Sequence, residues 1–214
     1  MPKCPFVKLL IISPLLLLGF MHPALAHPHV WVDYYVDAVS SKEGITKLKF
    51  RWHFDDMFTS MVEEDFNIKS ITPKNVNTLR DSAFSNLKNY HYYTYIKFDG
   101  KEFEPKEISD FGALLKGKNL EYTFTIILPH PAKEVELSLY DPEFYVDIGP
   151  PMLGAESDSV GIMSSATMKP KPFITTSSSD GAKAPTCEYH AGQPRVSQTW
   201  GAFAVYVVNC HAST

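Results

Sequence analysis

The sequence predicts a β-rich α+β domain: an antiparallel sheet or sandwich with one or two helices inserted after the first hairpin. Two segments, Val30–Ala38 and Thr46–Phe54, alternate apolar and polar residues with the two-residue period of half-buried strands. The short turn between them, 40–44, predicts an antiparallel hairpin. From residue 55 to 89 the spacing becomes helical, and afterwards the chain returns to short strands separated by Gly, Pro and Asp turns.

The first hairpin is expected to have one apolar face and one polar face. The polar face carries His29, Asp33, His53 and Asp55. Two registers fit the sequence: one places His29 opposite Asp55 and Asp33 opposite Arg51, and the other places His29 opposite His53. In both registers these four side chains share one side of the hairpin, because only a one-residue slip exchanges the faces.

Two helices are expected after the hairpin. The first begins at Asp55-Asp56, where an aspartate can cap it, and its apolar stripe is Met57, Phe58, Met61 and Val62. The second has Thr72 as its capping residue and Pro73 at the first helical position, and should end near Asn89.

The second half of the chain is predicted to be rich in strands. The candidate strands are 91–98, 103–110, 119–128, 134–140, 143–148 and 203–209. Asp141, between two of them, is expected to accept hydrogen bonds within a turn. The segment at about 149–185 is rich in Ser, Gly and Pro, and reads as a flexible excursion from the domain.

The amino terminus has the three parts of a secretory signal peptide over residues 1–26. Lys3 and Lys8 supply positive charge, 9–20 is a short apolar run, and Ala24-Leu25-Ala26 is a cleavage pattern. Cleavage leaves 27–214 as a single domain and, with Lys3 and Lys8 removed, shifts the formal charge from −4 to −6. The exported chain is therefore expected not to span the membrane, and its acidic balance argues against nucleic acid as a partner.

Two cysteines, Cys187 and Cys210, remain after cleavage. An even pair in an exported chain predicts one disulfide. Their neighbours His190 and His211 add metal-ligand residue types, but an oxidising compartment favours the disulfide over a thiolate site.

Candidate metal ligands gather at the new amino terminus. The free amine and imidazole of His27 can chelate a metal, and His29, Asp33, His53 and Asp55 can complete a site that suits zinc or nickel. Pro28 lacks the amide proton that a square-planar amino-terminal copper or nickel site loses on binding. The alternatives are solvated histidines, an ion pair of Asp33 with Arg51 or Lys49, and a purely capping role for Asp55.

The same segments, with several others, carry a resemblance to a known family. They are 27–33 (HPHVWVD), 54–59 (FDDMFT), 83–87 (AFSNL), 92–96 (YYTYI) before Asp99-Gly100, 138–146 (SLYDPEFYV), and a closing strand that ends in cysteine. The chain thereby resembles DUF1007, a family of uncharacterised exported bacterial proteins. The resemblance implies a periplasmic location, and similar proteins are labelled as the periplasmic component of an undefined ABC-type transport system and accompany nickel/cobalt-type membrane transporters.

The expected function is therefore that of a periplasmic accessory protein which binds a divalent transition metal, zinc or nickel, and assists a membrane metal transporter. No catalytic motif supports an enzyme. The alternative is a metal-independent interaction module whose contacts come from the aromatic segments 92–95 and 144–145, and a copper-dependent oxidative enzyme built on His27 ranks third.

Overall fold

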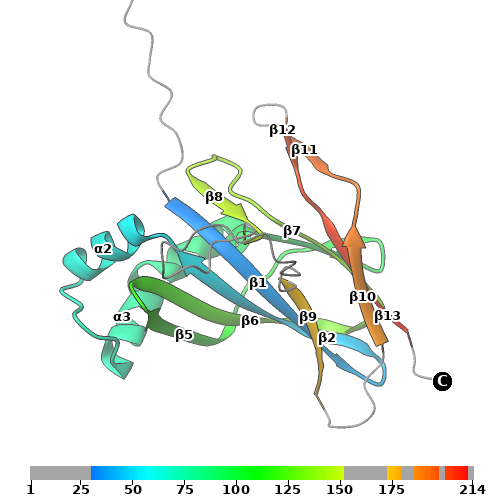
Figure 1. Ribbon diagram of the computed structural model, residues 1–214. Helices are drawn as coiled ribbons and strands as arrows, with labels where there is room; N and C mark the ends of the chain where they lie inside the picture. Colours follow the sequence, from blue (N-terminus) through cyan, green and yellow to red (C-terminus); the bar gives the residue numbers. More distant parts are fainter. Residues whose placement is uncertain (1–29, 152–172, 180–185, 198–200, 212–214) are drawn as a thin grey trace, which may run out of the picture.

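Two β sheets pack face to face in the computed structural model, which describes residues 30–151, 173–179, 186–197 and 201–211 (Figure 1). The helical elements are α2 (Asp56–Asp65), α3 (Pro73–Ser82) and the 3₁₀ segment η3 (Phe84–Tyr93). The strands are β1 (Val30–Ser41), β2 (Gly44–Phe54), β3 (Thr94–Phe98), β4 (Lys101–Phe103), β5 (Ser109–Lys116), β6 (Asn119–Ala132), β7 (Glu134–Leu139), β8 (Val146–Gly149), β9 (Ile174–Ser178), β10 (Thr186–Ala191), β11 (Arg195–Ser197), β12 (Gly201–Phe203) and β13 (Tyr206–His211).

The first sheet has the strand order β5-β6-β2-β1-β8, and β9 also pairs with β1. The second sheet has the order β10-β13-β7-β3-β4, while β11 and β12 form a separate two-stranded ribbon. The predicted β-rich α+β fold, with antiparallel sheets and helices inserted after the first hairpin, is confirmed. One feature was not expected: β8 and β9 both run parallel to β1.

The hairpin of β1 and β2 has the expected faces but neither of the expected registers. Asp33 pairs with His53, and Asp37 pairs with Lys49. The reason lies in the turn, because Ser41 already pairs with Gly44 and a register irregularity falls between Val39 and Ser40. The turn is therefore tighter than the five residues expected from sequence. Gly44 has φ +138°, and a Cβ there would lie 2.5 Å from the carbonyl oxygen of Ala132, so this position requires glycine.

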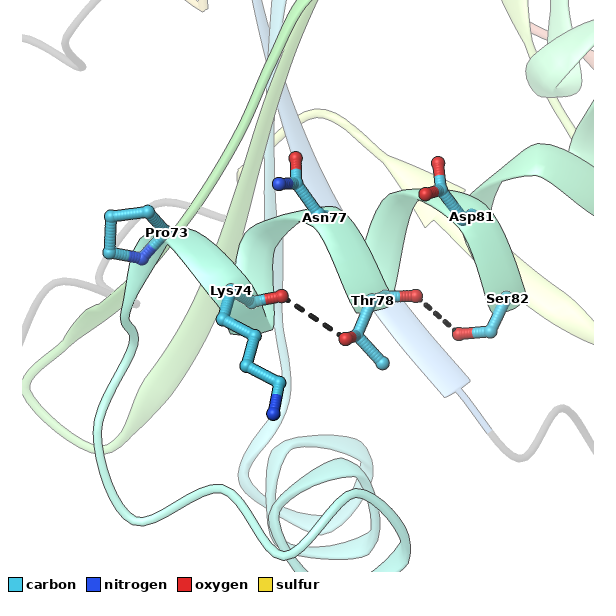
Figure 2. A pocket seen from close by; sticks show the side chains of 6 residues that line it. All are labelled: Pro73, Lys74, Asn77, Thr78, Asp81 and Ser82. Atoms are coloured by element: carbon cyan, nitrogen blue, oxygen red, sulfur yellow. Dashed lines mark hydrogen bonds between the residues drawn. The ribbon is translucent and has the colours of Figure 1, made fainter.

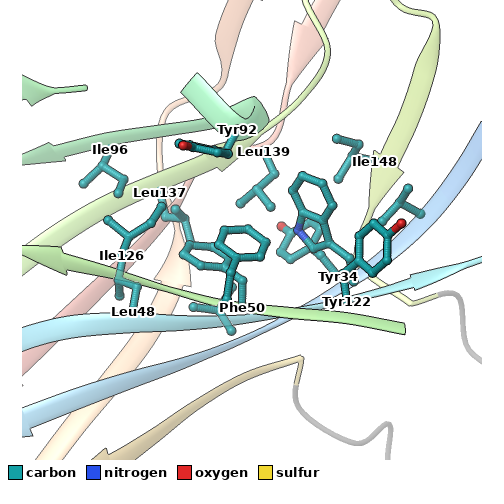
Figure 3. Packing of buried hydrophobic residues seen from close by; sticks show 14 of the residues in the cluster. Tyr34, Leu48, Phe50, Tyr92, Ile96, Tyr122, Ile126, Leu137, Leu139 and Ile148 are labelled. Atoms are coloured by element: carbon teal, nitrogen blue, oxygen red, sulfur yellow. The ribbon is translucent and has the colours of Figure 1, made fainter. Parts of the chain in front are cut away.

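The core between the sheets is rich in aromatic side chains (Figure 3). Trp52 packs edge-on against Phe124 with ring centroids 5.1 Å apart, and Phe50 stacks on Phe124 at 4.9 Å. Phe84 from η3 enters the same cluster and contacts Trp52 at 5.9 Å. Offset and edge-on contacts of this kind add to the stabilisation that burial alone provides.

Helix α2 begins as predicted but does not bury the predicted stripe. Oδ1 of Asp55 accepts a hydrogen bond from the amide of Phe58 at 2.8 Å and caps the helix. The buried residues of α2 are Thr59 and Val62, whereas Met57 and Met61 are exposed to solvent. The stripe prediction is therefore half wrong, because the helix approaches the sheet through a different face.

Helix α3 is shorter than predicted. Thr72 and Asn75 form a reciprocal capping box, and Pro73 occupies the first turn. The α-helix ends at Ser82 rather than near Asn89, and the chain continues as η3. This tighter winding accompanies the burial of Phe84, whose ring stacks on Tyr92 at 5.5 Å. The expected strand over 91–98 consequently starts only at Thr94.

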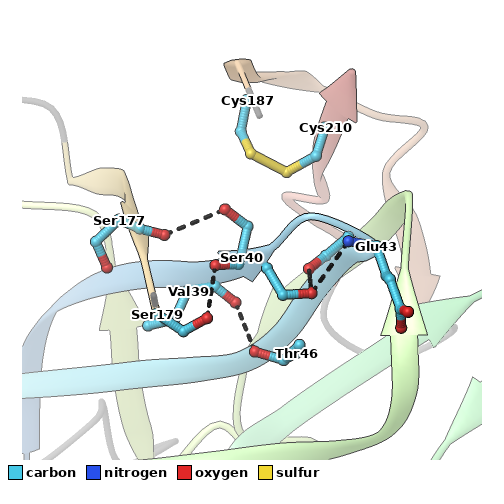
Figure 4. Close-up of a disulfide and its surroundings, with 10 residues drawn as sticks. Val39, Ser40, Glu43, Thr46, Ser177, Ser179, Cys187 and Cys210 are labelled. Atoms are coloured by element: carbon cyan, nitrogen blue, oxygen red, sulfur yellow. Dashed lines mark hydrogen bonds between the residues drawn. A yellow bond between two sulfur atoms is a disulfide. The ribbon is translucent and has the colours of Figure 1, made fainter. Parts of the chain in front are cut away.

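The predicted disulfide between Cys187 and Cys210 is present, and the two cysteines are cross-strand partners in β10 and β13. It lies beside the closed end of the first hairpin (Figure 4). Close to it, Ser40 donates a hydrogen bond to the carbonyl oxygen of Ser177 at 3.2 Å, which ties β9 to β1. Part of the expected excursion is thus a strand, and the parts 152–172 and 180–185 lie outside the described residues.

Candidate functional site

Three ionisable side chains lie in line across the outer face of the first sheet. Asp33 on β1 pairs with His53 on β2, and His53 pairs in turn with Glu121 on β6. We call these three residues the polar rung. They share a face because the partners in one row of a sheet project to the same side. The opposite face of the same strands carries Tyr34, Trp52 and Tyr122 into the core.

The geometry of the rung centres on the carboxylate of Glu121. Its Oε2 lies 4.0 Å from Nδ1 of His53 and 3.8 Å from Nε of Arg51. The Glu121 side chain is only 7% exposed, whereas that of His53 is 28% exposed. Both distances are too long for hydrogen bonds, so this buried carboxylate lies beside Arg51 and His53 without a hydrogen bond to either.

Arg51 supplies the positive charge beside the rung. Its guanidinium carbon lies 4.2 Å from the ring centroid of Tyr35, a cation–π contact. Its Nε is buried and has no hydrogen-bond partner within the described part of the chain. The expected alternative, an ion pair of Asp33 with Arg51 or Lys49, is not among the ion pairs of the described residues, and Arg51 lies beside Glu121 instead.

Asp33 is half-buried at the other end of the rung. Burial raises the pKa of its carboxyl group above the usual value, and the nearby His53 acts in the opposite direction. The imidazole of His53 thus stands between two acids, Asp33 on one side and Glu121 on the other.

Asp55 has a structural role. Its Oδ1 caps α2, and its Oδ2 accepts a hydrogen bond from the amide of Trp31 at 2.8 Å. The carboxylate therefore fastens the helix to the first residues of β1. It lies just beyond the end of β2, as the capping residue of α2, and is not part of the polar rung.

The remaining predicted ligands, His27 and His29, lie outside the described residues. Within the described ranges, no group of three or more His, Cys, Asp or Glu side chains is arranged to hold a metal ion. The sequence reasoning brought Asp33 and His53 together correctly but missed Glu121. Its place on the polar side of 119–128 was visible, but its position beside His53 depends on the register of β2 with β6.

The rung contains suitable donors for zinc or nickel but is not closed around a metal position. Neighbouring ligands of a tetrahedral zinc ion are about 3.4 Å apart. The 4.0 Å between Nδ1 of His53 and Oε2 of Glu121 is therefore slightly too wide. The positive charge of Arg51, 3.8 Å from the same Glu121 oxygen, would oppose an added cation.

A surface hollow over α3 offers much less chemistry (Figure 2). The hydroxyls of Thr78 and Ser82 donate to backbone carbonyls one turn earlier, and Asp81 pairs with Arg80. The polar groups of this hollow are thus largely occupied by the helix itself.

Among the described residues, no helix has the length and apolar character needed to cross a membrane.

Fold and site together define a two-sheet α+β domain with a disulfide between strands of one sheet and a row of ionisable groups on the outer face of the other. Residues 12–199 match the family described as "Protein of unknown function (DUF1007)", and the chain belongs to this family.

An uncharacterized protein of Haemophilus influenzae is similar to this chain, with 28% identity over 130 residues. The match covers 57% of this chain and 62% of that relative, so it spans less than two thirds of the relative's length. No solved structure matches the chain.

Proposed function

We propose that this protein is a periplasmic accessory protein that binds a divalent transition metal, zinc or nickel, and assists a membrane metal transporter. The observation that carries the proposal is the polar rung, in which His53 stands between Asp33 and Glu121. Imidazole and carboxylate are ligands that suit these metals. The transporter part rests on the association that the family resemblance implies.

In this proposal His53, Asp33 and Glu121 provide donors from the sheet, and His27 and His29 provide donors from the segment before β1. His27 and His29 lie outside the described residues, and the double variant described below tests their contribution. Asp55 supports the site indirectly, by holding the start of β1 against α2.

Metal binding at the polar rung would compete with protons for the ligand atoms. Metal ligands must be deprotonated, so the affinity should fall as the pH is lowered. The buried carboxylate of Glu121 gains a close positive partner on binding, which its 3.8 Å contact with Arg51 does not provide.

Isothermal titration of zinc and nickel into the chain beginning at His27 tests the proposal. We expect a dissociation constant below about 1 µM, with marked weakening in His53→Ala and Glu121→Gln. His190→Ala is the matched control, because His190 is an exposed histidine on the second sheet. Affinity weaker than this, or affinity unchanged in a His29→Ala, His53→Ala double variant, would overturn the proposal.

The alternative, a metal-independent interaction module, remains a second candidate but needs a different surface. Tyr92 is only 4% exposed, and Tyr95 stacks on Tyr140 with ring centroids 4.1 Å apart, so segment 92–95 is largely covered. Tyr145, in contrast, is 58% exposed. Recovery of a membrane partner in the presence of a chelator would favour this candidate over metal delivery.

A further inference from the structure

Helix α2 presents apolar side chains to solvent. Met57 is 56% exposed and Met61 is 49% exposed, and they lie four residues apart on one side of the helix. We call these two residues the methionine face. Trp31 is also exposed and lies at the start of the helix, where its amide binds the capping residue Asp55.

The charges of α2 are all of one sign. The helix contains Asp56, Glu63, Glu64 and Asp65 and has no lysine or arginine. Three of these acids lie in the last turn, where the helix dipole is negative and acidic side chains are unfavourable. No ion pair neutralises Glu63, Glu64 or Asp65 within the part of the chain that the structure describes.

Neither the methionine face nor the acidic last turn is part of the packed core. The helix is anchored by Thr59 and Val62 and by the Asp55 cap, so the methionine face adds nothing to the core. The acidic last turn works against the helix that contains it. Exposed apolar residues and unfavourably placed charges of this kind are characteristic of surfaces that bind a partner.

We infer that the methionine face of α2 is a docking site for a segment of another protein that combines apolar side chains with lysine or arginine. Unbranched thioether side chains adapt to apolar partners of different shapes. Basic groups on the partner would pair with the uncompensated acids of the last turn and relieve their conflict with the helix dipole. This inference does not depend on metal binding.

Charge also argues against the other possible occupants. A second copy of this chain would bring the same four acids to the interface, and like charges at close range oppose association. An anionic membrane surface would be repelled for the same reason. A cationic apolar polypeptide is the partner for which both the methionines and the acids are favourable.

The experiment uses a synthetic amphipathic peptide of about four helical turns, with leucines on one face and lysines on the other. Its binding to the exported chain is measured by titration calorimetry, and the methyl groups of ¹³C-labelled methionines are followed by NMR. We expect shifts of the Met57 and Met61 signals, and about tenfold weaker binding in a Met57→Ser, Met61→Ser variant. A Glu64→Gln, Asp65→Asn variant should bind the peptide more weakly at low salt, and its affinity should depend less on salt concentration.

The matched control is Leu114→Ser with Ile127→Ser, which removes exposed apolar side chains from β5 and β6 instead. This variant should bind the peptide normally. Equal binding to the methionine variant, or equal binding of a peptide with glutamate in place of lysine, would overturn the inference. So would binding to phosphatidylcholine vesicles without binding to the lysine peptide, since that result would assign the surface to lipid. If the protein proved not to bind zinc or nickel, the outcomes expected for the peptide would stay the same, because the methionine face does not include the polar rung.

Discussion

The hydroxyl of Tyr122 lies in the core without a hydrogen-bond partner in the described structure, and so does Nε1 of its cross-strand neighbour Trp52. Burial also raises the pKa of Tyr122, because the charged phenolate is disfavoured there. An unsatisfied buried polar group costs about 1–3 kcal/mol. Tyr122→Phe should therefore leave the free energy of unfolding unchanged or raise it, as measured by urea denaturation. A clear loss of stability would show that the hydroxyl has a partner, such as a buried water.

Asp33 gives a pH-dependent prediction. Its pKa is raised above 3.8 mainly by burial, so the folded state holds the proton more tightly than the unfolded chain does. As pH rises through this raised pKa, ionisation lowers the free energy of unfolding. Asp33→Asn should consequently be more stable than the unmodified protein at neutral pH, and the difference should vanish near the ordinary pKa of aspartate.

Urea denaturation of both proteins across this pH range checks the prediction, and the difference between the two curves isolates Asp33 from other titrating groups. In the proposed metal site the same substitution should weaken zinc or nickel binding. If the substitution raises the free energy of unfolding but lowers the affinity for the metal, Asp33 has a binding role and not a structural one. A less stable Asp33→Asn protein at neutral pH would contradict the assignment of burial as the main cause.

Asp141 shows how far residue chemistry alone can be read from sequence. It was expected to accept hydrogen bonds in a turn, and its Oδ1 accepts from the amide of Glu143 at 2.9 Å. Its Oδ2 accepts from the amides of Tyr145 and Val146 at 3.0 and 2.9 Å. This local role was predictable because all three donors lie within five residues. The contacts of Glu121 were not predictable in this way, because it meets its neighbours only through strand pairing.

At the scale of elements, the most unusual backbone is the end of η3. His91, Tyr92 and Tyr93 have φ values of 53°, 53° and 51°, a run of three left-handed residues without glycine. Each such residue costs about 1–2 kcal/mol relative to right-handed backbone. The run ends η3 and leads directly into β3, with Tyr92 buried and Tyr93 stacked on Trp52 at a centroid distance of 6.4 Å. Packing of these rings therefore holds the strained turn in place.

His91 is the member of this turn that is easiest to change, because among the described residues its one ring contact is an edge contact with Tyr95, at 6.1 Å. His91→Gly should raise the free energy of unfolding by about 1 kcal/mol, since glycine adopts this backbone without strain. His91→Val should lower it, because a branched Cβ is disfavoured at positive φ. Thermal or urea denaturation of both variants provides the measurement. The reverse order of stability would mean that the turn is not left-handed.

Strands were easier to predict than helices, and α2 shows why. The alternation in β1 and β2 has only two possible faces, so identifying the apolar side was sufficient. A helix can rotate about its axis, and the apolar residues of α2 cover a wide arc. The Asp55 cap and the contact of Thr59 with the amide of Leu120, at 2.9 Å, fix that rotation. They leave Met57 and Met61 outside, which sequence spacing alone did not indicate.

At the scale of the whole molecule, the disulfide closes the long C-terminal hairpin at the edge of the second sheet. Cys187 and Cys210 are 23 residues apart in sequence. A crosslink of this loop length stabilises a fold by about 3 kcal/mol, chiefly through the unfolded chain. A Cys187→Ser, Cys210→Ser variant should lose about this much in urea denaturation and should no longer respond to reductant. If reductant leaves the unmodified protein equally stable, the bond contributes little to the fold.

The sequence by itself determined the fold class, the apolar faces of the first two strands, the capping residues of the helices and the cysteine pair. These follow from periodicity, local hydrogen bonding and residue type, all of which act over a few residues or depend on composition. Tertiary structure decided the register that pairs Asp33 with His53, the arrival of Glu121 beside them, the parallel pairing of β8 and β9 with β1, and the outward face of α2. Each of these depends on where segments distant in sequence meet, and many pairings satisfy the same local pattern until the packed core selects one.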